Sequence, residues 1–252
     1  MADIFDYLIW RGDLSLEAVP LNPVDTLILS ELSYLGLEGL VPGDFRHPVP
    51  LKVMAEAMLA LPDRENRVRT KKDLDLLAAC AQAPRFRDLW LLFYSNELLP
   101  EIQSQFAAVT WRLPDDSALI TYRGTDLSLT GWKEDFNMSF QSSVPAQEKA
   151  LWYLEAFARV HGGPIRLAGH SKGGNLAVYA AARCQPEVRK RIEAVHNHDG
   201  PGFFAAMLED PGYREVLPRV RTFVPQSSVV GMLLEHEEPY SVIRSRQLSL
   251  LQ

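Results

Sequence analysis

The chain has 252 residues, 47% of them hydrophobic and 23% charged, so it is long enough and apolar enough to bury a sizeable core. The formal net charge of −6 argues against nucleic acid or an anionic membrane as the main partner, because both bind a basic face. No apolar run reaches the ~20 residues of a membrane span, and residues 1–20 lack the basic and apolar segments of a signal peptide, so we expect a cytoplasmic protein. Cys80 and Cys184 lie in apolar, helical-looking segments and are expected to be free buried thiols.

The first 104 residues are predicted to be mostly helical. Asn22-Pro23, directly before an apolar run with helical spacing, is typical of the start of a helix. Two further segments have helical composition, and the second contains a proline that interrupts it. The expected helices of this portion are 23–37, 50–62 and 71–93.

From residue 105 the pattern changes to strands that alternate with helices. β-branched and aromatic residues on both sides of a Pro-Asp-Asp turn predict a β-hairpin, and the later alternation is typical of a largely parallel sheet covered by helices. We therefore predict one α/β domain over residues 1–252, with a mainly helical portion (1–104) packed on a sheet-forming core (105–252). The expected strands are 105–113, 118–124, 164–169, 192–199, 220–225 and 240–245, and the expected helices are 145–163 and 171–184.

Ser171 lies in a Gly169-x-Ser171-x-Gly173 motif, between a strand signal and an alanine-rich helical run. In that context the motif predicts a nucleophile elbow, where a serine is exposed on a strained turn and the glycines allow close packing. The following helix points its N-terminal amides at the site, so the Lys172 amide is a candidate oxyanion donor. The alternative is a glycine-rich corner without chemistry, because the motif alone also occurs by chance.

Thr125 is the candidate for a second oxyanion donor. In α/β-hydrolases this donor comes from the loop after an early strand, and Thr125 follows the second strand of the predicted hairpin. Its backbone amide and its hydroxyl can both donate. The alternative is that Thr125 and Asp126 only begin a turn.

Together with Trp132 and Asp135, these motifs resemble the class 3 (fungal-type) lipases and, more closely, an uncharacterised bacterial family of lipase-like α/β-hydrolases related to them. The resemblance covers nearly the whole chain. It implies an α/β-hydrolase fold, a serine hydrolase of lipase or esterase type and an oxyanion role for Thr125, and it does not identify a substrate. The segments that carry it are Asn22-Pro23-Val24-Asp25, Arg123-Gly124-Thr125, 169–177, 197–204 and 224–245.

Asp199 is the predicted acid. The order of the triad in this fold is serine, acid, histidine, and Asp199 follows the next strand signal after Ser171. Class 3 lipases carry their aspartate one strand later, where this chain has no carboxylate in Gln226-Ser227-Ser228. The alternatives are an aspartate that caps the turn formed by Gly200-Pro201-Gly202 and, less well placed, an acid at Glu235, Glu237 or Glu238.

His236 is the predicted base, since it is the one histidine that follows Asp199. Its acidic surroundings also fit a solvated residue. In the family that the chain resembles, the catalytic-looking histidine comes a few residues after a segment similar to 240–252. The triad is therefore either completed by His236 or incomplete within these 252 residues.

His196 and His198 lie two residues apart on a predicted strand, so both side chains point to one face and could chelate a metal together. No third histidine or cysteine lies at ligand spacing, and we expect neither a metal nor a cofactor. His170, beside the serine, is interpreted as structural.

The sequence thus predicts a serine hydrolase that acts on a small-molecule or lipid ester through an acyl-enzyme on Ser171. The alternative is a non-catalytic α/β-hydrolase-like protein with an incomplete triad and a binding or regulatory role.

Overall fold

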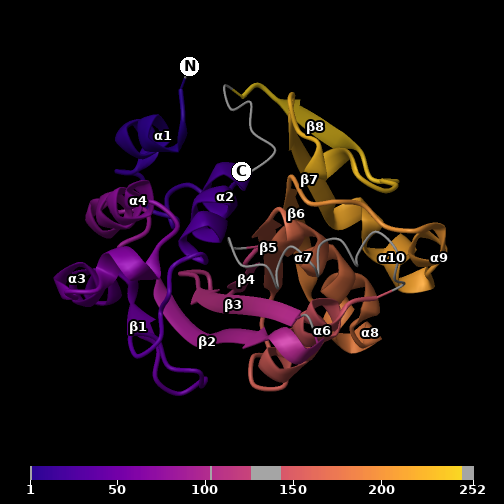
Figure 1. Cartoon of the computed structure of the whole chain (residues 1–252), viewed down its shortest axis with the longest axis horizontal. Coiled ribbons are helices and arrows are strands. Elements are labelled where there is room, and N and C mark those ends of the chain that lie inside the picture. The colour runs from indigo at the N-terminus through magenta and orange to yellow at the C-terminus, as the bar shows by residue number, and fades with distance from the viewer. Residues whose placement is uncertain (1, 103, 126–142, 246–252) are drawn as a thin grey trace.

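A computed structural model describes residues 2–102, 104–125 and 143–245 (Figure 1). The strands form one eight-stranded mixed sheet whose spatial order is that of the chain. The first four strands pair antiparallel, and the pairings from β4 to β8 are parallel, as the alternation of strands and helices predicted. The strands are β1 (Val49–Pro50), β2 (Trp90–Leu99), β3 (Ser104–Arg112), β4 (Ala118–Tyr122), β5 (Ile165–His170), β6 (Ile192–His198), β7 (Val220–Pro225) and β8 (Tyr240–Ile243).

Helices cover both faces of this sheet (Figure 1). Side chains alternate along a strand, so neighbouring residues of β4 serve different layers. Leu119 packs with Ile28 and Leu29 of α2, whereas Ile120 packs with residues of α6 and α7 on the other face. The helices are α1 (Ile4–Arg11), α2 (Pro23–Leu32), α3 (Leu51–Ala60), α4 (Lys71–Gln82), α6 (Pro145–Ala158), α7 (Lys172–Arg183), α8 (Pro186–Arg189), α9 (Ala205–Leu208) and α10 (Pro211–Val216), with short 3₁₀ turns η1 (Arg64–Arg67), η2 (Pro100–Ile102), η3 (Leu217–Arg219) and η4 (Val230–Met232).

The helix predicted over 71–93 is wrong in its second half. The helix α4 ends at Gln82, and Trp90 already begins β2, which pairs with β3. A short apolar run such as 89–94 has no helical period of its own and fits a buried strand equally well. The sheet therefore begins inside the portion that was expected to be mainly helical. The other expected helices and strands are present, with ends that differ by a few residues.

The start of α2 is fixed by a capping box and a buried ion pair. The Asn22 side chain accepts hydrogen bonds from the amides of Val24 and Asp25, and the Asp25 carboxylate accepts one from the Asn22 amide at 2.8 Å. The guanidinium of Arg85 donates two hydrogen bonds to the same carboxylate, and both side chains are fully buried. Loss of either partner would leave an uncompensated buried charge, so α2 is held firmly against the rest of the chain.

Cys80 and Cys184 are free and buried, as predicted. Burial raises the pKa of both thiols, that of Cys184 to about 12, so neither is a reactive thiolate at neutral pH. Within the described ranges, no helix is long and apolar enough to cross a membrane.

Candidate functional site

Ser171 forms the junction between β5 and α7. Its backbone has φ 57° and ψ −131°, a conformation that L-residues rarely adopt. The Ser171 amide donates to the carbonyl of His198 at the end of β6, at 2.8 Å. The side chain is half-buried, and no hydrogen bond of the described residues involves its hydroxyl. The strained turn therefore presents an unengaged hydroxyl at the N-terminus of α7.

The two glycines of the motif are required by packing. A Cβ added to Gly169 would lie 2.2 Å from the carbonyl of Gly173, and a Cβ on Gly173 would lie 2.0 Å from the carbonyl oxygen of Tyr122. The strand, the turn and the helix therefore approach one another as closely as the motif predicted.

The loop after β4 runs beside the Ser171 turn. A Cβ added to Gly124 would lie 3.1 Å from the Cβ of Ser171 and 2.5 Å from the carbonyl oxygen of His170. Thr125 is the next residue and is half-buried. Lys172 begins α7 on the other side of the serine, and its buried side chain donates to the Gln105 carbonyl at 2.9 Å. Of the two residues proposed as oxyanion donors, Lys172 is the chain neighbour of Ser171, and Thr125 follows the residue that lies against the Ser171 turn. Asp126, Trp132 and Asp135 lie outside the described residues.

Asp199 follows β6, and its carboxylate reaches the turn after β7. Its backbone has φ 61°, and its amide donates to the carbonyl of Phe223 in β7 at 2.9 Å. A Cβ added to Gly231 would lie 2.2 Å from Asp199 Oδ1, so the carboxylate lies directly against that turn. Burial raises the pKa of Asp199, while the Ser228 hydroxyl, His170 and the Gly231 amide act in the opposite sense. Within the described part of the chain, Oδ1 has no hydrogen-bond partner.

The loop that carries Asp199 is tied to the serine helix by Asn175. The Asn175 side chain donates to the carbonyls of Pro201 and Gly202 at 3.1 and 3.0 Å, and it accepts from Gln147 at 2.8 Å. The sequence analysis included Asn175 in the motif run 169–177 and gave it no role of its own. Because Asn175 lies one helical turn beyond Ser171, this contact fixes the serine turn and the Asp199 loop relative to each other.

The side chain of His236 pairs with Glu238 rather than with Ser171 or Asp199. Its Nδ1 lies 2.9 Å from Oε1 of Glu238, a carboxylate that also accepts from Thr222 at 2.6 Å and from Tyr213 at 3.0 Å. Thr222 is in the middle of β7, whereas Ser171 and Asp199 follow the carboxyl ends of their strands. In the chain as described, Nε2 of His236 is buried without a partner, and no hydrogen bond joins His236 to Ser171 or Asp199.

Glu238 was one of three glutamates considered as less well placed acids, and it is the buried one. Burial alone would raise its pKa, but the hydrogen bonds from His236 and Thr222 outweigh burial and lower it. His236 is therefore paired with Glu238, whereas Ser171 and Asp199 follow the ends of the neighbouring strands β5 and β6. A sequence pattern cannot show which carboxylate a histidine will contact after its turn folds.

His196 and His198 share one hydroxyl, that of Thr26 in α2. The Thr26 oxygen lies 2.8 Å from Nδ1 of His196 and 3.0 Å from Nε2 of His198, and it also donates to the Pro23 carbonyl at 3.0 Å. The hydroxyl has one proton, and it donates that proton in the hydrogen bond to the Pro23 carbonyl. Nδ1 of His196 and Nε2 of His198 therefore both act as donors to the Thr26 oxygen. The histidines face one side of the strand, as predicted. Within the described ranges, no three side chains of histidine, cysteine or acid converge on a metal position.

We expect the free energy of unfolding to fall as the pH drops from about 6.5 to about 4. Burial, followed by Arg221 and Arg166, lowers the pKa of His196 to about 4, and burial also lowers that of His198. The unfolded chain, whose histidines titrate near 6.5, therefore binds protons first and is favoured at low pH. For His196 alone the loss is on the order of 3 kcal/mol.

Urea unfolding at pH 7.0 and pH 4.5 measures this effect. His196→Asn, which retains a donor for Thr26, is expected to show a smaller difference between the two pH values than the unmodified chain. Equal differences for both chains would contradict the assignment to His196.

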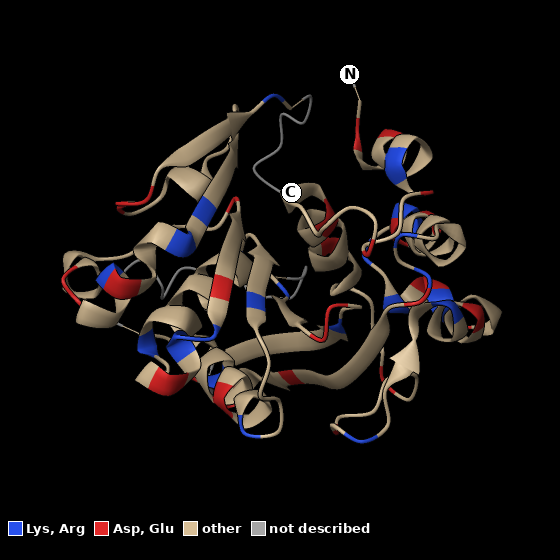
Figure 2. Cartoon of the chain, turned by 180° about the vertical axis from the view of Figure 1, so that it is seen from behind, with Lys and Arg blue, Asp and Glu red and all other residues tan. Residues whose placement is uncertain are grey.

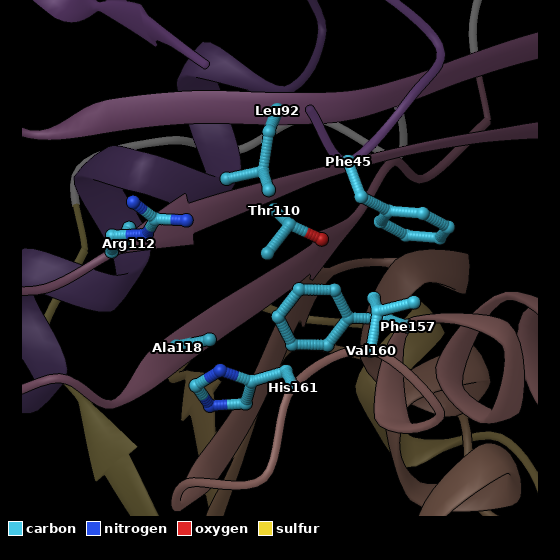
Figure 3. Close-up of a pocket in the computed structure, with 8 residues that line it drawn as sticks. All are labelled: Phe45, Leu92, Thr110, Arg112, Ala118, Phe157, Val160 and His161. Atoms are coloured by element: carbon cyan, nitrogen blue, oxygen red, sulfur yellow. The ribbon is translucent and has the colours of Figure 1, made fainter. Parts of the chain in front are cut away.

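A pocket of about 90 Å³ lies at the opposite end of the sheet from Ser171 (Figure 3). Ala118 in its wall is the first residue of β4 and pairs with Ile165 at the start of β5, whereas Ser171 follows the end of β5. The pocket is therefore separate from the serine turn. Its lining residues are Phe45, Leu92, Thr110, Arg112, Ala118, Phe157, Val160 and His161.

Acidic and basic segments are interspersed over the helices and strands in the view of Figure 2.

Among solved structures, the chain is similar to M37 lipase, with 17% identity, a TM-score of 0.51 and coverage of 84% of this chain and 69% of that one. It is also similar to a triacylglycerol lipase from Penicillium expansum, with 11% identity, a TM-score of 0.42 and coverage of 61% of this chain and 70% of that one. A third similar structure is Rhizomucor miehei lipase in a propeptide complex, with 12% identity, a TM-score of 0.41 and coverage of 92% of this chain and 76% of that one. None of the curated proteins matches the sequence.

The similarity to M37 lipase and the mostly parallel sheet covered by helices confirm the predicted α/β-hydrolase fold. The expected bacterial origin and the relation of the family to class 3 lipases stay predictions. Residues 80–252, which are most of the chain and include Ser171, match one family along their whole length. The chain belongs to the Mbeg1-like family.

Proposed function

We propose that this protein is a serine hydrolase of lipase or esterase type, with Ser171 as the nucleophile. The observation that carries the proposal is the strained backbone of Ser171, which holds an unengaged hydroxyl at the N-terminus of α7. Strain of this kind persists where the surrounding structure enforces it, commonly at reactive positions. The positive end of the helix favours negative charge at the reacting centre.

In the proposed reaction, the Ser171 oxygen attacks the carbonyl carbon of an ester and gives its proton to a general base. The amides of Thr125 and Lys172 donate to the oxyanion of the tetrahedral intermediate. The intermediate collapses by breaking the bond to the alcohol, which takes the proton from the base and leaves an acyl-enzyme. Water, deprotonated by the same base, then attacks the carbonyl carbon of the acyl-enzyme. The bond to the Ser171 oxygen breaks, the base returns its proton to that oxygen, and the carboxylic acid product is released. The name of M37 lipase favours a lipid ester, and a smaller ester is the other substrate class of the proposal.

We assign the role of the acid to Asp199. Class 3 lipases carry this carboxylate after the strand that corresponds to β7, and the chain has only Gln226-Ser227-Ser228 there. Asp199 follows β6, and its carboxylate lies against the turn of Ser228 and Gly231, which follows β7. The neighbouring strand thus provides a carboxylate beside the turn where class 3 lipases carry theirs. A base oriented by this acid would hydrogen-bond its free oxygen, Oδ1.

A non-catalytic α/β-hydrolase-like protein with a binding or regulatory role is the second candidate. The position of His236 favours it, because this histidine pairs with Glu238 and makes no hydrogen bond to Ser171 in the described chain. Without an imidazole within reach, the Ser171 hydroxyl keeps its proton and attacks slowly. In the catalytic proposal His236 is the base, and the variant described next tests it.

We expect a fluorophosphonate probe to label Ser171 and no other serine, because the probe reacts with hydroxyls that are activated by a base. Peptide mapping by mass spectrometry after labelling identifies the modified residue, and the heat-unfolded chain, which should stay unlabelled, is the control. His236→Ala in the same assay decides whether His236 is the base: labelling is lost if it is and persists if it is not. A label on another serine would contradict the assignment of Ser171 as the nucleophile, and no label at all would support the non-catalytic candidate.

A further inference from the structure

Tyr34 lies just after α2, with its hydroxyl between the serine turn and the loop after β4. The hydroxyl is 3.1 Å from Nδ1 of His170 and 3.4 Å from the His170 carbonyl oxygen. A Cβ added to Gly124 would lie 2.2 Å from the same hydroxyl. Tyr34 is 5% exposed. One buried side chain therefore contacts the residue before Ser171 and the residue before Thr125.

The ring of Tyr34 is itself held in place. The guanidinium of Arg69 lies over the ring, 3.5 Å from its centre, and pairs with the carboxylate of Glu31. Glu31 also lies 3.6 Å from Nδ1 of His170. His170, interpreted from sequence as structural, is thus contacted by two side chains from α2 and the residues that follow it. Burial raises the pKa of Tyr34, so its hydroxyl stays protonated and can donate.

We propose that Tyr34 is a positioning residue for ester hydrolysis at Ser171, an inference that rests on the proposed function. Its hydroxyl fixes the spacing between the Ser171 turn and the loop that carries Thr125. The two oxyanion donors lie on these two segments, and they must both reach the same oxygen at ~2.7–3.1 Å. A misplacement of about 1 Å at a reacting centre can cost on the order of 100-fold in rate.

Tyr34→Phe tests the proposal by the kinetics of fluorophosphonate labelling. We expect the maximal labelling rate constant to fall by about 10- to 100-fold, with the half-saturating probe concentration unchanged within about twofold. A structural role alone would lower the fraction of chains that can be labelled and leave the rate constant of the folded ones unchanged.

The matched control is Tyr94→Phe. Tyr94 is also buried, but its hydroxyl donates to Glu38 and contacts the Leu35 carbonyl, and it makes no hydrogen bond to the serine turn in the described chain. Its removal should leave the labelling rate constant unchanged. Should Tyr34→Phe not fold, Arg69→Met, which frees the Tyr34 ring and keeps its hydroxyl, is expected to lower the rate constant by a smaller factor.

Equal rate constants for Tyr34→Phe, Tyr94→Phe and the unmodified chain would overturn the positioning role while the reactive serine stands. Absence of labelling in the unmodified chain would overturn the proposed function and this inference together. The two failures are therefore distinguishable in one experiment.

Discussion

Ser171→Ala is expected to lower kcat for hydrolysis of p-nitrophenyl acetate by a factor on the order of 10⁶, the effect of removing the nucleophile from an intact triad. The variant keeps the backbone turn, since alanine differs only by the hydroxyl. Initial rates at saturating substrate, corrected for spontaneous hydrolysis, measure the ratio. The oxyanion donors and the binding site remain, so a residual rate of roughly 10³–10⁴ over water is expected.

Ser241→Ala is the control for this experiment, because Ser241 is exposed on β8. It should have the kcat of the unmodified chain. Equal rates for Ser171→Ala and the unmodified chain would mean that Ser171 is not the nucleophile. This is the outcome that the non-catalytic candidate predicts.

Asp199→Asn is expected to lower kcat by about 10⁴, because an amide cannot hold the base in the required tautomer or stabilise its charged form. Its melting temperature at pH 7 should stay the same or rise. The pKa of Asp199 is raised above its usual value, so the ionised carboxylate costs folding free energy at any pH above that pKa, and a neutral amide removes the cost.

This pairing of a lost rate with an unchanged melting temperature separates the catalytic role from turn capping. An aspartate that only capped the turn would lose stability on substitution and keep its rate. Glu238→Gln is the matched comparison, since the pKa of Glu238 is lowered by its donors and its charge stabilises the fold. Glu238→Gln should lower the melting temperature. A drop in kcat as large as that of Asp199→Asn would assign the role of the acid to Glu238 instead.

The sequence predicted those parts of the site that depend on neighbours in the chain. The turn at Ser171 follows from a strand, two glycines and a helix within a few residues, and each of these has a local signature. Asp199 was placed at the end of β6 for the same reason. Its contact with the turn of Gly231 was not predictable, because it depends on how a loop after another strand folds back.

The parts that the sequence did not predict are contacts between distant segments. The assignment of 89–93 to a helix failed because the run is apolar on every side, and only the pairing with β3 decides its conformation. Likewise, the bond from His236 to Glu238 depends on Thr222 and Tyr213, which lie in elements far away in the chain. The Tyr34 hydroxyl reaches His170 across 136 positions.

The placement of α2 has a practical consequence for where this protein can be cut. The family match begins at residue 80, yet Ile28 and Leu29 cover Ala168 and Leu119 of the central strands, and Thr26 satisfies two buried histidines. A recombinant fragment that starts at the family boundary would expose this apolar face of the sheet to water and leave those polar groups without their partner. Such a fragment would be prone to aggregate, so expression clones of this protein should retain the segment upstream of the match.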